Sequence, residues 1–383
     1  MNRAPAWTDL FLPPTGTASE RESRALLVLY KGTEPLLVLP RKAGLARRGL
    51  DLYPAQSRLA RLARWTWRQT LRFGYAPGAR NQELCLSLAD SFARFLGTVA
   101  SVPNTDRAAS QGAAAQRSSP AVPEFALLAG NPHAPGRRFL LLVFDQAGRP
   151  AAVVKAGVES AAVHLIEQEA EFLDGTPAGM FGVPRLKGRF HEERRGALAM
   201  EFIDGTSPSP TESDRVAPLL NAWLGSEPPA PLDTFGAWQR LVKACAGDDA
   251  FSPLARRLGS ASVRPAVFHG DLAPWNIKAP RGGGDWVVLD WERGEWRGLP
   301  GWDWFHFVLQ PAILVRKQTA AELAATAKAL LGSPSFKTYA QASGLAGRER
   351  DWLLAYLWHC RRVLRPAEGS PRIDELLAML QAG

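Results

Sequence analysis

Cysteine is scarce in this chain, and long apolar runs are missing from it. The 383 residues include three cysteines, Cys85, Cys245 and Cys360, which are too widely separated to form a metal-binding or redox motif. A sparse, odd cysteine count indicates a reducing compartment. Apolar runs extend for only about six or seven residues, whereas a membrane helix needs ~20. Since Met1 to Gly16 also lacks the apolar core of a signal peptide, we expect a cytoplasmic protein with no membrane span.

Acidic residues are outnumbered by basic ones. Lysine and arginine total 46 and aspartate and glutamate 37, which gives a formal net charge of +9. Five arginines recur at steps of three and four residues from Arg58 to Arg72 and predict a basic amphipathic helix from about Pro54 to Phe73. Such a helix can contact anionic lipid, nucleic acid or a phosphorylated substrate, but a solvated face is the simpler interpretation. Nucleic acid is not an expected partner, because helix-turn-helix, zinc-finger and aromatic RNA-binding signatures are missing.

Composition and length are those of a folded protein with two or three domains. Hydrophobic residues make up 46% of the chain and charged residues 22%. Two apolar runs around Lys31 to Glu34 predict a hairpin, the basic helix follows, and a further helix is expected from Leu84 to Val99. Residues 1–100 are therefore interpreted as a small α/β extension. Residues 101–123 are rich in Ala, Ser, Gln and Pro without apolar periodicity, which is typical of a flexible linker.

The most informative segment reads His-Gly-Asp-Leu-Ala-Pro-Trp-Asn-Ile and begins at His269. It places Asp271 five residues before Asn276, and a short apolar run that ends at Asp290 follows. In phosphoryl transfer, a first aspartate orients the acceptor hydroxyl and takes its proton, while an asparagine and a second aspartate hold magnesium on the nucleotide phosphates. The pattern predicts these roles for Asp271, Asn276 and Asp290.

The segment between the two expected metal ligands has a turn signal at its centre. Arg281 to Asp285 is glycine-rich, and short apolar stretches flank it, so the pattern predicts a β-hairpin. The two ends of a hairpin lie close together, which would bring Asn276 and Asp290 to one ion. Magnesium prefers oxygen ligands and usually takes one or two carboxylates together with phosphates and water.

Upstream, two strands and a helix are expected in the order that a kinase uses. Phe139 to Phe144 and Ala151 to Lys155 predict strands, and residues 161–173 predict a helix. A kinase places a strand lysine on the nucleotide phosphates and holds it with a helix glutamate. Lys155 is the predicted lysine and Glu169 its preferred partner, although periodicity also allows Glu167 and Glu171.

Two further stretches fit positions that a nucleotide would occupy. Residues 130–138 are turn-rich, and Gly130 and Gly136 would allow the backbone to approach the phosphates, although an ordinary hairpin turn is an equal interpretation. After a predicted hairpin over residues 184–202, the strand is broken by a polar segment. In a kinase this would be the hinge, where the Glu201 carbonyl and the Ile203 amide would hydrogen-bond adenine.

Helical periodicity dominates after residue 205. The expected helices are residues 216–224, 234–246, 303–317, 320–331, 348–363 and 373–380. We therefore expect a β-rich N-lobe over residues 124–204 and a helical C-lobe with the catalytic loop over residues 205–383. Polar side chains such as His306 and His359 would line an acceptor pocket, but the pattern distinguishes none of them.

Together these motifs resemble the aminoglycoside phosphotransferase and choline-kinase-like branch of the protein-kinase fold, over roughly residues 124–383. The His-Gly-Asp order at His269 and the Asp-Trp-Glu that begins at Asp290 are closer to this branch than to protein kinases. The resemblance implies an α+β, bilobal protein-kinase-like fold with ATP and Mg²⁺ as cofactors. It implies that His269 braces the catalytic loop and that Asp303 supports it. The sequence departs from the family pattern in the phosphate-covering loop.

The expected activity is ATP-dependent transfer of the γ-phosphoryl group to a hydroxyl of a small molecule, such as a sugar, an amino alcohol or an aminoglycoside. Two other hypotheses remain. One is a nucleotide-binding pseudokinase that regulates a partner, although Lys155, Asp271, Asn276 and Asp290 are all intact. The other is an anionic-surface-binding module that uses the basic helix. The sequence does not determine the acceptor, the choice between ATP and GTP, or the oligomeric state.

Overall fold

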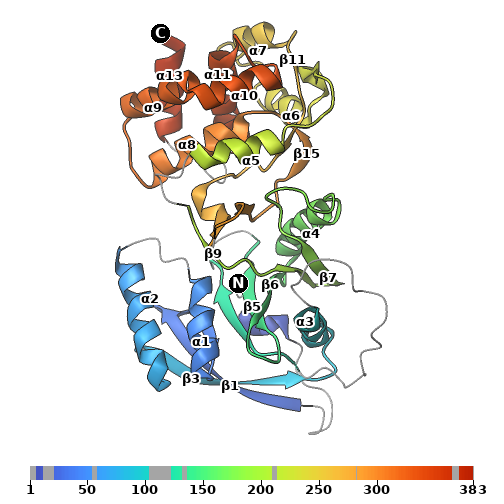
Figure 1. The fold of residues 1–383 in the computed structure, drawn as a ribbon, viewed down its shortest axis with the longest axis vertical. Helices are drawn as coiled ribbons and strands as arrows, with labels where there is room; N and C mark the ends of the chain where they lie inside the picture. The colour runs from blue at the N-terminus through green and yellow to red at the C-terminus, as the bar shows by residue number, and fades with distance from the viewer. Residues whose placement is uncertain are drawn as a thin grey trace. The chain divides into compact units, whose positions relative to one another are not determined.

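The chain folds into two compact units, seen here in a computed structural model (Figure 1). The structure describes residues 6–11, 21–53, 58–102, 122–131, 136–208, 214–281, 283–364 and 371–382, so the predicted linker lies almost wholly outside the described residues. Unit 1 comprises Met1–Asp174 and Pro184–Phe202, and unit 2 comprises Gly175–Val183 and Ile203–Gly383. A β-rich unit therefore precedes a mainly helical one, as the expected α+β fold requires.

Unit 1 is built on one eight-stranded sheet with the strand order β3-β1-β2-β4-β5-β6-β8-β7. Its strands are β1 (Arg21–Lys31), β2 (Glu34–Pro40), β3 (Ala79–Ser87), β4 (Phe125–Ala129), β5 (Phe139–Phe144), β6 (Pro150–Gly157), β7 (Leu186–Glu192) and β8 (Arg195–Glu201). Its helices are η1 (Trp7–Leu10), α1 (Ala43–Gly49), η3 (Leu50–Leu52), α2 (Arg58–Thr70), η4 (Leu71–Phe73), α3 (Ser91–Ser101) and α4 (Ser160–Asp174).

Strands β1, β2 and β3, which come from the first hundred residues, belong to this same sheet. Strand β2 pairs antiparallel with β4, with Leu37 opposite Leu128 and Val38 opposite Leu127. The helix expected from Leu84 to Val99 begins only at Ser91. Residues 79–87 instead form β3, and every residue of β3 pairs with β1. Leu84 and Leu86 are buried by that pairing, so sheet formation overrides the local helical spacing.

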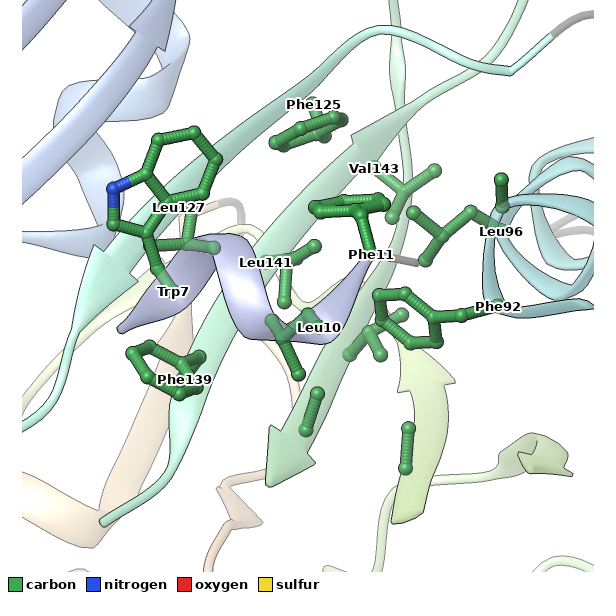
Figure 2. Packing of buried hydrophobic residues seen from close by; sticks show 14 of the residues in the cluster. Trp7, Leu10, Phe11, Phe92, Leu96, Phe125, Leu127, Phe139, Leu141 and Val143 are labelled. Carbon is green, nitrogen blue, oxygen red and sulfur yellow. The ribbon is translucent and has the colours of Figure 1, made fainter. Parts of the chain in front are cut away.

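Both faces of the sheet are covered, which explains the continuous apolar strands. One face packs against η1 and α3, and Figure 2 shows Trp7, Leu10 and Phe11 among side chains of β4, β5 and α3. The other face packs against α1 and η4. Alternation along β4 divides its residues between the two cores: Phe125 and Leu127 join the first and Ala126 the second.

Helix α4 lies close to strands β6 and β8 because glycines face it. A Cβ atom placed on Gly157 of β6 would come within 2.6 Å of the Ala162 Cβ, and one on Gly196 of β8 within 2.9 Å of Val163. Only residues without a side chain allow this approach. The approach brings α4 within reach of the β6 side chains.

Unit 2 is mainly helical. Its longer helices are α5 (Val216–Ala222), α6 (Gly236–Ala244), α7 (Ser252–Leu258), α8 (Trp302–Leu314), α9 (Ala320–Gly332), α10 (Pro334–Ser343), α11 (Glu349–His359) and α13 (Pro371–Ala382), with the short helices η6 (Leu232–Thr234), η7 (Pro274–Asn276) and η8 (Cys360–Leu364). The short strands are β9 (Gly205–Thr206), β10 (Ala230–Pro231), β11 (Ser262–Val263), β12 (Ala266–Phe268), β13 (Ile277–Pro280), β14 (Val287–Val288) and β15 (Glu295–Gly298). All six expected helices form, and α7 and α10 are additional. Within the described residues, none of the helices combines the length and the apolar character needed to cross a bilayer.

Candidate active site

In unit 1, Lys155 and Glu169 form a buried ion pair. Lys155 lies on β6 between Leu140 of β5 and Leu198 of β8, and Glu169 lies in the middle of α4. The lysine Nζ is 2.8 Å from Oε1 and 2.6 Å from Oε2 of Glu169. Glu169 is therefore the partner among the three glutamates that periodicity allowed. Glu167 instead contacts the exposed ring of His191.

The turn-rich stretch before β5 is described only in part, because residues 132–135 lie outside the described residues. Gly136 has a left-handed φ of 67°, and a Cβ atom there would lie 3.3 Å from the backbone of Ala161 at the start of α4. A Cβ atom on Gly130 would lie 2.2 Å from the Arg138 carbonyl oxygen. Close backbone packing thus requires glycine at position 130, and the left-handed φ favours glycine at position 136. Arg137 is buried with its guanidinium over Phe139, and burial lowers its pKa.

The expected hinge coincides with the boundary between the two units, which falls between Phe202 and Ile203. Glu201 ends β8, and its backbone N–H donates to the Arg185 carbonyl at 3.0 Å. Its side chain accepts a hydrogen bond from the Arg185 N–H at 2.9 Å. Ile203 follows in irregular backbone. Adenine binding at Glu201 and Ile203 stays a prediction.

In unit 2, the loop that carries Asp271 is fixed by Asp303 at the first turn of α8. The Asp303 carboxylate accepts the backbone N–H groups of His269 at 2.7 Å and Gly270 at 3.0 Å. Asp303 is buried, and burial raises its pKa to about 7. The two hydrogen bonds act in the opposite direction, because they favour the charged carboxylate, but their effect is smaller. The support that the resemblance implied for Asp303 is thus present as two hydrogen bonds to the loop backbone.

His269 is a buttress for the same loop. Its Nε2 lies 2.9 Å from the Leu289 carbonyl, and its Nδ1 accepts the Asp271 backbone N–H at 3.1 Å. Its ring also packs edge-on against Trp291, with 4.7 Å between ring centroids. Burial lowers the pKa of His269 to about 4, so the ring is neutral near pH 7 and both nitrogens are used within the protein. These contacts connect the loop to the segment that ends at Asp290.

The Asp271 carboxylate is held at both oxygens. Asn276 Nδ2 donates to Oδ2 at 2.9 Å and to the Asp271 carbonyl at 2.9 Å, and His306 Nε2 lies 2.9 Å from Oδ1. The side chain stays 28% exposed, so lone pairs of the carboxylate remain accessible from outside the protein. Burial raises the pKa of Asp271, but the hydrogen bond and charge of His306 outweigh that effect, and the net pKa is lowered. The carboxylate is therefore ionised at neutral pH.

Asn276 and Asp290 lie at the two ends of the predicted hairpin. Strands β13 and β14 pair through Ile277 opposite Val288, and the Leu289 N–H donates to the Asn276 carbonyl at 2.7 Å. Asp290 has a φ of 73°, one of two non-glycine residues with positive φ among the described residues. A non-glycine residue with positive φ carries backbone strain, and strained residues are concentrated at functional sites.

The oxygen donors fit a magnesium ion held together with a nucleotide. The Asn276 amide nitrogen donates to Asp271, so its Oδ1 would be available as a neutral ligand, and the Asp290 carboxylate would be a charged one. Across the residues that the structure describes, no group of three or more His, Cys, Asp or Glu side chains could hold a metal by itself. Mg²⁺ that is also bound by phosphates needs only one or two protein carboxylates.

Two residues of this site were not distinguished by the sequence. His306 lies on α8 and Tyr356 on α11, and the tyrosine hydroxyl lies 3.0 Å from His306 Nδ1. The two ring nitrogens of His306 therefore both have partners within unit 2, Asp271 at Nε2 and Tyr356 at Nδ1. The only sequence signal was that His306 follows Asp303 by three residues on one helix face.

The chain is similar to solved structures of small-molecule kinases. A fructosamine-3-kinase structure from Haemophilus somnus 129PT shares 12% identity over 68% of this chain and 92% of that chain, with a TM-score of 0.41. The aminoglycoside phosphotransferase APH(4)-Ia, solved as a mutant with ADP and hygromycin B, shares 15% identity over 67% of this chain and 94% of that chain, with a TM-score of 0.44. An aminoglycoside-3'-phosphotransferase of type VIII shares 17% identity over 73% and 93%, with a TM-score of 0.30.

No protein-family model matches the sequence, and no curated protein matches it. At these identities and TM-scores, function has to be inferred from the residues of the site.

Proposed function

We propose that this protein is an ATP-dependent phosphotransferase that moves the γ-phosphoryl group to a hydroxyl of a small molecule. The observation that carries the proposal is the setting of Asp271. Its carboxylate is ionised, partly exposed and held between Asn276 and His306, on a loop that Asp303 fixes through two backbone N–H groups. This is the preorganisation that a residue orienting an acceptor hydroxyl requires.

The residues of unit 2 have distinct proposed roles. Asp271 would accept the proton of the acceptor hydroxyl. As that happens, the hydroxyl oxygen of the acceptor would form the new bond to the γ-phosphorus, and the bond from that phosphorus to the ADP oxygen would break. Asn276 and Asp290 would hold Mg²⁺, which when bound neutralises charge on the transferring phosphoryl group. His269 would keep the loop in place and stay neutral throughout. His306 would hold the Asp271 carboxylate in one orientation.

In unit 1, Lys155 would contact the nucleotide phosphates, with its ammonium oriented by Glu169. A buried lysine that is held by a carboxylate remains charged and has little conformational freedom, which suits it to a fixed phosphate. Glu201 and Ile203 would bind adenine, and Gly130 and Gly136 would border the phosphates. ATP is proposed as the donor, and the protein is proposed to act in the cytoplasm.

An ADP-release screen over sugars, amino alcohols and aminoglycosides tests the proposal. The wild-type protein should release ADP with at least one acceptor class, and the Asp271→Ala protein, used as the blank, should not. A matched control is Asp285→Ala, which changes an exposed aspartate in the hairpin turn and should leave ADP release unchanged. Tight Mg-ATP binding with no acceptor-dependent ADP release across the panel would favour a regulatory nucleotide-binding role instead.

A further inference from the structure

Helix α2 turns an apolar row toward solvent. Leu59, Leu62 and Trp65 are 80%, 58% and 60% exposed, and their spacing of three residues places them on one side of the helix. Phe73 and Tyr75, just beyond the helix end, are 88% and 62% exposed. Exposed apolar residues that occur singly are ordinary, but five in one short segment form a surface that marks an interaction site.

The row faces outward because the opposite side of α2 is attached to the rest of unit 1. The Trp67 indole N–H donates to the Pro77 carbonyl at 3.1 Å, and its ring packs edge-on against Tyr53. Leu71, which follows the helix in η4, is fully buried. These contacts determine which side of α2 the protein covers, so the exposure of Leu59, Leu62 and Trp65 is a fixed property of the fold.

The surroundings of the row are cationic. From Leu52 to Gln82 the sequence has no Asp or Glu, but it has six arginines. Arg68 pairs with Asp51, and Arg64 donates to the Tyr53 carbonyl. Arg61 and Arg72 are exposed, and no ion pair joins either of them to a described residue. On a helical wheel they lie within about 40° of Trp65, so positive charge borders the apolar row directly.

We propose that this face of α2, with Phe73 and Tyr75, docks the protein on the surface of an anionic lipid bilayer. Leucine and aromatic side chains enter the boundary between headgroups and acyl chains, while arginines along the border bind lipid phosphates. A second copy of the chain would bring two sets of unpaired arginines together, which is unfavourable. Single-stranded nucleic acid would use the aromatic rings, but it would leave Leu59 and Leu62 without a role. The inference does not depend on the proposed phosphotransferase activity.

Sedimentation of the full-length protein with vesicles tests this docking. Vesicles of phosphatidylcholine mixed with phosphatidylglycerol should bind the protein, and vesicles of phosphatidylcholine alone should bind it at least roughly tenfold more weakly, because each arginine near an anionic surface contributes about 1 kcal/mol. The variant Leu59→Ser/Leu62→Ser/Trp65→Ser should lose most of the binding. The variant Arg61→Gln/Arg72→Gln should bind roughly thirtyfold more weakly and depend less on salt than the wild type.

Two matched controls separate this face from general stickiness and general charge. Leu314→Ser/Val315→Ser removes exposed apolar residues from unit 2, and Arg256→Gln/Lys328→Gln removes two exposed charges there. Both should bind anionic vesicles like the wild type. Circular dichroism melts of all variants should coincide, since every changed side chain is exposed.

Equal binding by the wild type and the two α2 variants, or no binding to anionic vesicles, would overturn the proposal. So would a wild-type dimer that the apolar variant converts to monomer, or tighter binding to single-stranded RNA than to vesicles.

Discussion

His306 Nε2 lies 2.9 Å from Oδ1 of Asp271, although 35 residues separate the two along the chain. Tyr356, from a third segment, contacts the other ring nitrogen of His306 at 3.0 Å. Three segments of unit 2 thus define the orientation of one carboxylate, and the hydrogen bond of His306 lowers its pKa. In the proposed reaction, this arrangement keeps Asp271 deprotonated and aimed at the acceptor hydroxyl.

Replacing His306 should move the acid limb of the pH profile. The His306 hydrogen bond lowers the pKa of Asp271, so His306→Phe should raise that pKa, and activity should be lost at a higher pH than in the wild type as the base becomes protonated. We also expect turnover at neutral pH to fall roughly tenfold, the value of one hydrogen bond to a charged group. Tyr356→Phe keeps the ring and should give a smaller change in the same direction. A pH-rate profile of ADP release checks this, and an unmoved acid limb in His306→Phe would show that the contact is only structural.

Asp271 and Asp290 should separate turnover from nucleotide binding. Asp271→Ala removes the proposed base, so ADP release should fall by roughly 10²–10⁴-fold while the Kd for Mg-ATP stays within a few-fold. Asp290→Ala removes the charged Mg²⁺ ligand and should weaken Mg-ATP binding as well. Calorimetric titration with ATP, with and without Mg²⁺, measures both. Wild-type turnover by Asp290→Ala on the true acceptor would refute the metal assignment.

Replacing one member of the Lys155–Glu169 pair should destabilise the protein strongly, whereas replacing both should destabilise it much less. Glu169→Leu leaves a buried ammonium without its carboxylate and should reduce the free energy of unfolding by roughly 3–5 kcal/mol. Lys155→Met/Glu169→Leu should recover most of that loss but bind Mg-ATP weakly. Urea unfolding followed by circular dichroism gives the stabilities. Glu167→Leu, on the same helix but in a half-exposed pair with His191, should change stability by less than about 1 kcal/mol.

Gly270 and Gly283 allow packing to be distinguished from backbone strain. Their φ angles are 80° and 82°, so alanine is strained equally at both. A Cβ atom on Gly270 would also lie 2.9 Å from the Arg293 Cβ, whereas one on Gly283 would meet nothing within 4 Å. Gly283→Ala should therefore cost about 1 kcal/mol, and Gly270→Ala clearly more, with loss of activity because the loop shifts. Equal unfolding free energies for the two variants would contradict this packing argument.

His359 should make the protein sensitive to acid. Burial against Trp302 lowers the pKa of His359 to about 3, below its unfolded value near 6.5. A lowered folded-state pKa gives stability that is fully present above about pH 6.5 and is lost as the pH falls toward 3. The raised pKa of Asp303 acts in the opposite direction between about pH 7 and 4, so total stability alone is a poor test.

The informative measurement for His359 is therefore a difference between variants. Between pH 7 and pH 5 the wild type should lose about 2 kcal/mol more unfolding free energy than His359→Leu, which cannot be protonated. The exposed His191→Gln protein should follow the wild type. Urea unfolding at both pH values provides the comparison, and parallel losses in all three proteins would rule out a buried neutral His359.

The sequence by itself predicted the features that are local in the chain. The hairpin between Asn276 and Asp290 follows from its glycine-rich turn, and strand β6, helix α4 and the loop before η7 follow from short-range spacing. The phosphoryl-transfer motif at Asp271 is local in the same sense, because its residues are fixed relative to one another by a few turns of backbone.

Tertiary structure decided the rest. Spacing could not choose Glu169 over Glu167 and Glu171, because the choice depends on how closely the glycines of β6 and β8 let α4 approach. Residues 84–87 became strand because β1 was available to pair with them. His306 reaches Asp271, and Leu59 faces solvent, only because distant segments pack around them. Periodicity reports which side of an element is apolar, whereas the free energy of packing, which involves residues far apart in the chain, determines what that side meets.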